Sequence, residues 1–177
     1  MAIIPAQAEP AAWRVTAGPP APAAVERLLR SLPQWFGIES STAEYIRMAA
    51  QLPAYLAWPA GPPPAGQQAF RPGDQPEPAG VLLAVRHFPR AAEIYLMAVD
   101  PAEHRRGAGR ALVTALERDL VVDGVRLLQV KTQGPSLPDA GYERTRKFYR
   151  AMEFEPLEEI AGLWPGNPCL IMVKTLG

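Results

Sequence analysis

The sequence predicts a single α/β domain that spans residues 1–177. Apolar runs typical of strands alternate with amphipathic segments typical of helices. Hydrophobic residues make up 48% of a chain that is long enough to bury one core. Pro and Gly cluster between residues 59 and 78, and we interpret this stretch as an exposed loop, because neither flank could hold a core alone.

The expected order is strand, two helices, three strands, helix, strand, helix and two strands. The strands are expected at residues 13–15, 55–58, 81–88, 93–99, 125–130, 154–164 and 169–176. The helices are expected at residues 21–32, at 42–52 with Ser40 or Ser41 as cap, from 108 to a stop at Asp123-Gly124, and at 142–152. The third helix has the clearest pattern, because Ala108, Leu112, Leu116 and Leu120 recur every four residues.

A basic turn with two glycines precedes that helix and reads His104-Arg105-Arg106-Gly107-Ala108-Gly109-Arg110. The first turn of a helix has free N–H groups at the positive end of its dipole, and glycine allows a ligand to approach the backbone. The turn therefore indicates a site for an anion such as a phosphate, with a solvated basic turn as the alternative. It is neither a Walker loop, which needs Lys-Ser or Lys-Thr, nor a dinucleotide fingerprint, because Leu112 stands where that motif needs glycine.

Composition excludes several classes of function. Lys plus Arg and Asp plus Glu number 18 each, which argues against a nucleic-acid partner. No apolar run approaches the ~20 residues of a membrane helix, and the first residues lack an export signal, so we expect a cytoplasmic protein. One cysteine and two histidines make a disulfide and a structural zinc site improbable, and Cys169 is expected to be a buried, inert thiol. No Gly-x-Ser-x-Gly elbow of a serine hydrolase occurs.

The run from His104 to Gly109 resembles the acetyl-CoA pyrophosphate loop of the GNAT N-acetyltransferase superfamily, Gln/Arg-x-x-Gly-x-Gly/Ala, with histidine at its first position. A second run, from Thr145 to Phe154, resembles another signature of that family, in which an aromatic-Tyr pair ends a helix and Gly-Phe follows. Glu153 replaces the usual glycine of this signature. Tyr142 stands where many members have an asparagine that contacts the pantetheine arm.

The resemblance implies a mixed β-sheet, splayed open near its middle and flanked by helices. It implies acetyl-CoA as co-substrate, without a metal. Tyr149 occupies the position of the family's tyrosine that lies near the CoA sulfur and protonates the departing thiolate; a core aromatic is the alternative. The implied cofactor-binding residues are Ala98, Val99, His104, Arg105, Arg106, Gly107, Ala108, Gly109, Arg110 and Tyr142.

Glu93 is the candidate general base, because it opens the strand that leads to the loop, at a spacing similar to that in the histone acetyltransferase branch of the superfamily. A neutral-pH base at this position needs a raised pKa or a relay water. A solvated charge at a hairpin end is the alternative, and His87 is a rival base. The apolar segment from Trp35 to Ile38 either borders the acceptor site or belongs to the core.

We therefore expect an acetyl-CoA-dependent N-acetyltransferase that acts on a primary amine of a small molecule or peptide, by direct attack in a ternary complex. A non-catalytic acyl-CoA-binding or sensing module is the alternative. The expected partners are acetyl-CoA and an amine acceptor, without nucleic acid or membrane, and a homodimer is left open.

Overall fold

The computed structural model describes residues 13–60 and 77–177, so most of the loop expected at 59–78 lies outside the described residues. Seven strands form one sheet in the order β1-β2-β3-β4-β5-β7-β6. They are β1 (Trp13–Gly18), β2 (Ala54–Pro59), β3 (Gly80–Phe88), β4 (Ala91–Val99), β5 (Leu127–Gln133), β6 (Glu155–Trp164) and β7 (Asn167–Thr175). The helices are α1 (Pro22–Arg30), α2 (Glu39–Ala49), α3 (Ala108–Val122) and α4 (Ala140–Ala151), and a short 3-10 turn, η1 (Pro101–Glu103), precedes α3.

The order of strands and helices confirms the expected one, but α2 begins earlier than its apolar periodicity suggests. Its N-cap is Ile38 in extended conformation, so Ser40 and Ser41 lie inside the first turn and the expectation that one of them caps the helix was wrong. Thr42 stabilises this start, because its hydroxyl donates to the Phe36 carbonyl over 3.0 Å.

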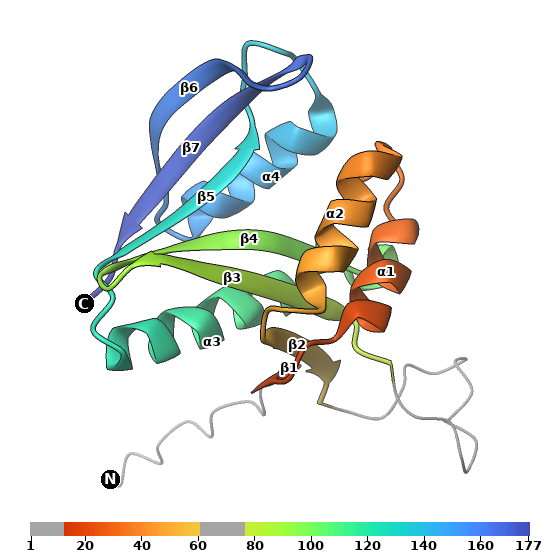
Figure 1. Ribbon diagram of the computed structural model, residues 1–177, viewed down its shortest axis with the longest axis vertical. Coiled ribbons are helices and arrows are strands. Elements are labelled where there is room, and N and C mark those ends of the chain that lie inside the picture. Colours follow the sequence, from red (N-terminus) through yellow and green to blue (C-terminus); the bar gives the residue numbers. More distant parts are fainter. Residues whose placement is uncertain (1–12, 61–76) are drawn as a thin grey trace, which may run out of the picture.

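The sheet divides into two halves between β4 and β5, as Figure 1 shows. These two strands run parallel and pair only from Ala91 to Ile94 on β4, opposite residues 127–130 on β5. A bulge follows directly, because Leu83 of β3 pairs with Leu96 and the next residue pairs with Ile94, which leaves Tyr95 as an extra residue. A bulge bends and twists its strand, so it directs β4 away from β5. The splayed sheet that the family resemblance implied is therefore confirmed.

Helices cover both faces of the sheet (Figure 1), and each face carries its own core. The core under α3 and α4 contains Leu112, Leu116 and Phe154, and the core under α1 and α2 contains Leu28 and Leu83, with others. Burying a leucine of this kind stabilises the fold by about 1.5–3 kcal/mol. The bulge also moves neighbouring residues to opposite faces, since Ile94 packs in the first core and Leu96 in the second.

Glu153 occupies a strained backbone position between α4 and β6. Its φ is 67°, in the left-handed region that favours glycine, and its carboxylate lies 3.2 Å from Lys174 Nζ. A side chain in this region costs about 1–2 kcal/mol.

We expect Glu153→Gly to raise the free energy of unfolding by about 1 kcal/mol, because it relieves the left-handed strain. Glu153→Ala is the matched control, since it removes the contact with Lys174 but keeps a Cβ. Chemical denaturation measures both. A gain for alanine as large as that for glycine would show that the carboxylate, and not the backbone, destabilises this turn.

Candidate functional site

The divergence of β4 from β5 leaves an open edge on β4. Consecutive residues of a strand direct their N–H and C=O groups to opposite edges. The Asp100 N–H donates to the Ala79 carbonyl, on the side of β3, so the groups of Val99 face the open edge. We call the space between the open edges of β4 and β5 the split. Accordingly, His104 Nε2 donates to the Val99 carbonyl over 2.8 Å, and the Val99 N–H points into the split.

The facing edge of β5 is contacted by a buried arginine of α4. The Gly134 N–H donates to Pro168 beside β7, so the groups of Gln133 face the split. Arg146 Nη1 donates to the Gln133 carbonyl over 2.9 Å. Arg146 is only 6% exposed, and no carboxylate within residues 13–60 and 77–177 forms an ion pair with it. Its other N–H groups can therefore donate to a polar group of a ligand in the split.

The segment between β4 and α3 has the conformation of an anion site. Arg105 and Gly107 both adopt left-handed conformations, with φ of 61° and 93°. The N–H groups of Ala108, Gly109 and Arg110 precede the first intrahelical bond of α3, and no side chain caps them among the described residues. Alternating backbone conformations before a helix direct successive N–H groups toward one point, where a phosphate can bind.

Neighbouring elements hold this segment in place. Trp13 of β1 donates from its indole nitrogen to the Arg106 carbonyl over 2.6 Å. The Arg106 guanidinium in turn pairs with Glu103 over 2.7 Å. A Cβ on Gly109 would lie 3.3 Å from the Phe148 ring, so glycine lets the start of α3 pack closely on α4. These contacts hold the loop in its conformation.

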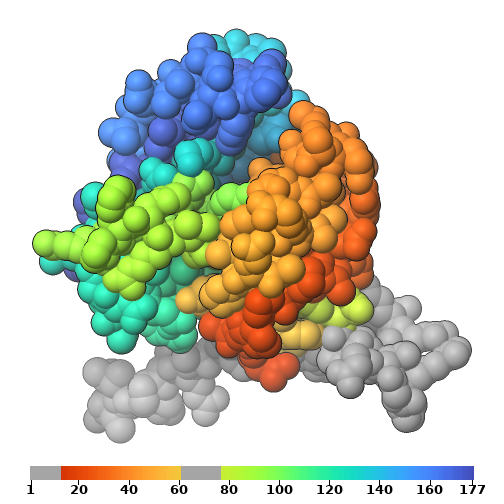
Figure 2. All heavy atoms as spheres, in the orientation of Figure 1, coloured from red at the N-terminus to blue at the C-terminus, as the bar shows by residue number. Residues whose placement is uncertain are grey.

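A cavity of about 360 Å³ opens beside the split. Its walls come from α2, β4, β5 and the hairpin between β6 and β7, through Ser40, Ser41, Glu44, Tyr45, Glu93, Tyr95, Lys131 and Trp164. Figure 2 shows β6 and β7 in blue in the upper part of this face and α2 in orange to their lower right. A cavity of this size accommodates a small molecule or a short piece of a peptide.

Glu93 is the most buried charged group of this cavity, at 5% exposure. Its Oε2 accepts hydrogen bonds from Lys131 Nζ and Gln129 Nε2, both over 2.7 Å, and lies 2.8 Å from His87 Nε2. Burial alone would raise the pKa of this carboxyl, but the three donors outweigh burial and hold the pKa below its ordinary value. Glu93 is thus ionised at neutral pH, and a raised pKa, one of the two ways in which it could serve as a base, does not apply.

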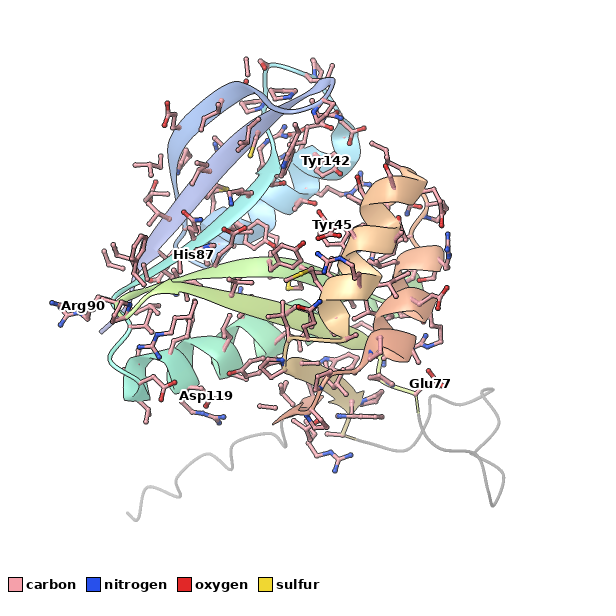
Figure 3. The ribbon with its side chains drawn as sticks, in the orientation of Figure 1. Tyr45, Glu77, His87, Arg90, Asp119 and Tyr142 are labelled. Carbon is pink, nitrogen blue, oxygen red and sulfur yellow. The ribbon has the colours of Figure 1, made fainter. Side chains whose placement is uncertain are left out.

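His87 approaches Glu93 from β3, and Figure 3 shows it toward the outer end of that strand, whereas Tyr45 of α2 lies nearer the middle of the sheet. His87 is largely exposed and does not line the cavity. Burial raises the pKa of the Tyr45 phenol to about 12. The α2 face of the cavity therefore presents a neutral phenol and the Glu44 carboxylate, which pairs with Arg47, and the β4 face presents the Glu93 carboxylate.

Tyr149 lies on the inner side of α4 and is buried. Its ring packs edge-on against Phe148 and Phe154, with ring centres 5.3 and 5.5 Å away. Burial raises the pKa of its phenol, which therefore stays protonated at neutral pH. Its hydroxyl makes no hydrogen bond to any described residue. Tyr149 thus has the packing expected of a core aromatic, and its hydroxyl has no partner among the described residues.

Tyr142 begins the same inner side of α4, and its hydroxyl donates to the Trp35 carbonyl over 3.4 Å. Ala98 is buried and pairs with Val81 of β3, which makes its backbone less accessible to a ligand than that of Val99. Cys169 is buried, as expected, and burial raises the pKa of its thiol.

The sequence analysis missed several residues of this site. Among them are the hydrogen-bond donors Trp13, Gln129, Lys131 and Arg146. Gln129 and Lys131 alternate along β5, which places both on one face of a strand, but only the register of β5 against β4 brings them to Glu93. Arg146 carries a weak signal, since its spacing from Tyr142 and Tyr149 puts all three on one helix face.

Comparison with known proteins gives one consistent result. Residues 27–154 match the model of the acetyltransferase (GNAT) family. A protein from Desulfovibrio desulfuricans described as a GNAT-family acetyltransferase has a similar structure, with a TM-score of 0.71 and 18% identity over 94% of this chain and 99% of the other. Among curated proteins none matches the sequence.

Two further structures show the same fold. The ribosomal-protein alanine N-acetyltransferase from Escherichia coli has a TM-score of 0.66 and 16% identity over 93% of this chain and 94% of its own. An aminoglycoside 6'-N-acetyltransferase complexed with coenzyme A has a TM-score of 0.63 and 17% identity over 92% and 96%. At these identities the likeness is one of fold.

Two properties of the described residues accompany this result. None of their helices is both long and apolar enough to cross a membrane. No cluster of histidine, cysteine and acidic side chains suited to a metal ion occurs among residues 13–60 and 77–177.

The family model covers most of the chain, and the splayed sheet and the loop before α3 with its two glycines are both in place. The protein therefore belongs to the GNAT family of acetyltransferases.

Proposed function

We propose that the protein transfers an acetyl group from acetyl-CoA to a primary amine of a small molecule or peptide, in a ternary complex. The supporting observation is the arrangement around the split. The loop before α3 (residues 104–110) and Tyr149 lie on the side of α3 and α4, whereas the cavity with Glu93 opens on the side of α2. Two ligands can thus reach the split from opposite faces of the sheet.

The residues present fit acetyl-CoA. The free N–H groups at the start of α3, with Arg105, Arg106 and Arg110 beside them, would hold the pyrophosphate. The N–H of Val99 on the open edge of β4 would donate to the thioester carbonyl oxygen as it becomes negative. Arg146 and Tyr142 lie along the other wall and would contact the pantetheine arm.

On the acceptor side, Glu93 would receive the proton of the attacking amine. Its lowered pKa makes it a weak direct base, so we assign it the relay-water route, in which the carboxylate orients a water that carries the proton. Tyr149 would supply a proton to the sulfur as the carbon–sulfur bond breaks.

A non-catalytic acyl-CoA sensor is the second candidate. Such a module needs the loop but has no use for a buried carboxylate in a second cavity or for an unpaired phenol in the core. Burying Glu93 costs desolvation that the fold offsets with three donors, which favours the enzyme. Free-thiol release from acetyl-CoA, measured across a panel of amines and peptides, tests the two candidates directly.

We expect Glu93→Gln to lower turnover of an accepted amine by about 10²–10⁴-fold while acetyl-CoA binding is retained. In the wild type the carboxylate works above its folded pKa, so activity falls as the pH drops through a value below the ordinary pKa of about 4.3, and the variant lacks that limb. Initial rates against pH measure both effects. Unchanged turnover, together with a loss in His87→Ala, would transfer the role to His87.

We expect Tyr149→Phe to lower kcat by about 10-fold, with the fold and the affinity for acetyl-CoA intact, because the ring still packs against Phe148 and Phe154. The loss is modest since a thiolate departs more easily than an amine. Steady-state rates and a calorimetric titration separate kcat from affinity. If neither changes, Tyr149 is a core aromatic only.

A further inference from the structure

The loop between α1 and α2 reaches across the split through one residue, Trp35. The Trp35 ring lies edge-on to the His104 ring, 5.9 Å between centres, and His104 follows β4. The same indole would be 3.5 Å from a Cβ on Gly141, at the start of α4. Its carbonyl accepts the hydrogen bond from the Tyr142 hydroxyl. Trp35 therefore contacts both walls of the split. We call Trp35, His104 and Tyr142 the aromatic bridge.

Both partners of Trp35 are positions at which this chain departs from the family pattern. His104 replaces glutamine or arginine, and Tyr142 replaces asparagine. Each departure introduces a ring, and both residues contact the same tryptophan: His104 through its ring and Tyr142 through its hydroxyl on the Trp35 carbonyl. His104 is also fixed on its other side, since Nε2 donates to the Val99 carbonyl on the open edge of β4. A ligand that lies along this edge must therefore meet the aromatic bridge.

The other end of the loop leads into the acceptor cavity. Phe36 packs edge-on against Tyr45, with ring centres 5.8 Å apart, and Tyr45 packs against Tyr95 over 5.6 Å. Both tyrosines line the cavity, as does Ser40 in the first turn of α2. Trp35 and Phe36 are adjacent in sequence, so the backbone of this loop joins the aromatic bridge to the rings that line the cavity.

We propose that Trp35 is a positioning residue that couples the two substrate sites. In this proposal, which rests on the proposed function, the pantetheine arm of acyl-CoA packs on the rings of Trp35 and His104. The loop and α2 are thereby held in the arrangement that receives the amine. Coupling of this kind is reciprocal, and its usual size is about 5–150-fold in affinity.

Amide hydrogen exchange of α2 (residues 39–49), with and without saturating CoA, tests the proposal without any knowledge of the acceptor. In the wild type we expect CoA to slow exchange in α2 by about 5-fold or more. In Trp35→Leu, CoA should still bind through the loop before α3, as calorimetry measures, but α2 should no longer respond. Trp35→Phe, which keeps a ring, should restore most of the response.

Two further variants make the test specific. The double variant His104→Gln/Tyr142→Asn restores the family residues and should abolish the response of α2 while it leaves Trp35 in place. Trp58→Leu is the control, because Trp58 bonds Thr16 at the far end of the sheet and lies outside the cavity. Its response should equal that of the wild type.

The outcomes separate this proposal from the proposed function. CoA that binds the wild type without slowing exchange in α2 overturns the coupling and leaves the proposed function intact. The coupling is also overturned, and the proposed function left intact, if CoA slows exchange in α2 of Trp35→Leu and of the double variant as much as in the wild type. Failure of CoA to bind the wild type contradicts the proposed function and the coupling together. If Trp35→Leu does not fold, the double variant decides.

Discussion

The parallel pairing of β4 and β5 stops after Ile94 and Val130, and the rest of the site depends on that early stop. Two strands that remain paired satisfy each other's backbone groups and leave no room between them. Here the bulge at Tyr95 bends β4 away, so that both strands keep open edges beyond the point where their pairing ends. Val99, Gln133 and the cavity with Glu93 all owe their exposure to ligands to this divergence.

The two buried charged side chains at the split, Glu93 and Arg146, have different kinds of partner. Glu93 is buried but surrounded by three donors, so it stays ionised at the cost of being a weak base. Arg146 is buried and bonds one backbone carbonyl, with no carboxylate partner in the described chain. The fold thus offers a carboxylate paired with Lys131 on the acceptor side and spare hydrogen-bond donors on the cofactor side. The carboxylate can accept a hydrogen bond from an amine or a water, and the donors are complementary to the carbonyls of a thioester arm.

The sequence predicted what short-range pattern determines. The periodicity from Ala108 to Leu120 predicted α3, and the resemblance to known signatures placed the loop before it and Tyr149 on α4. It did not predict the donors on Glu93, because Lys131 is far from Glu93 in the chain and meets it only through the register of β5. The contact of Trp35 with His104 and Tyr142 was beyond reach for the same reason. The prediction that Ser40 or Ser41 caps α2 was wrong because Thr42 stabilises an earlier start of this helix.

The central claim is that acyl-CoA binds on the loop before α3 (residues 104–110). Its most direct test is a thermal melt with and without acetyl-CoA. At 100 times its dissociation constant, the ligand should add about 2.7 kcal/mol to the wild-type stability. Gly107→Glu should abolish this gain, whereas Gly124→Glu, which strains a similar left-handed turn (φ 75°) at the other end of α3, should keep it. A wild-type melt that acetyl-CoA leaves unmoved, or an equal gain in Gly107→Glu, would contradict the claim.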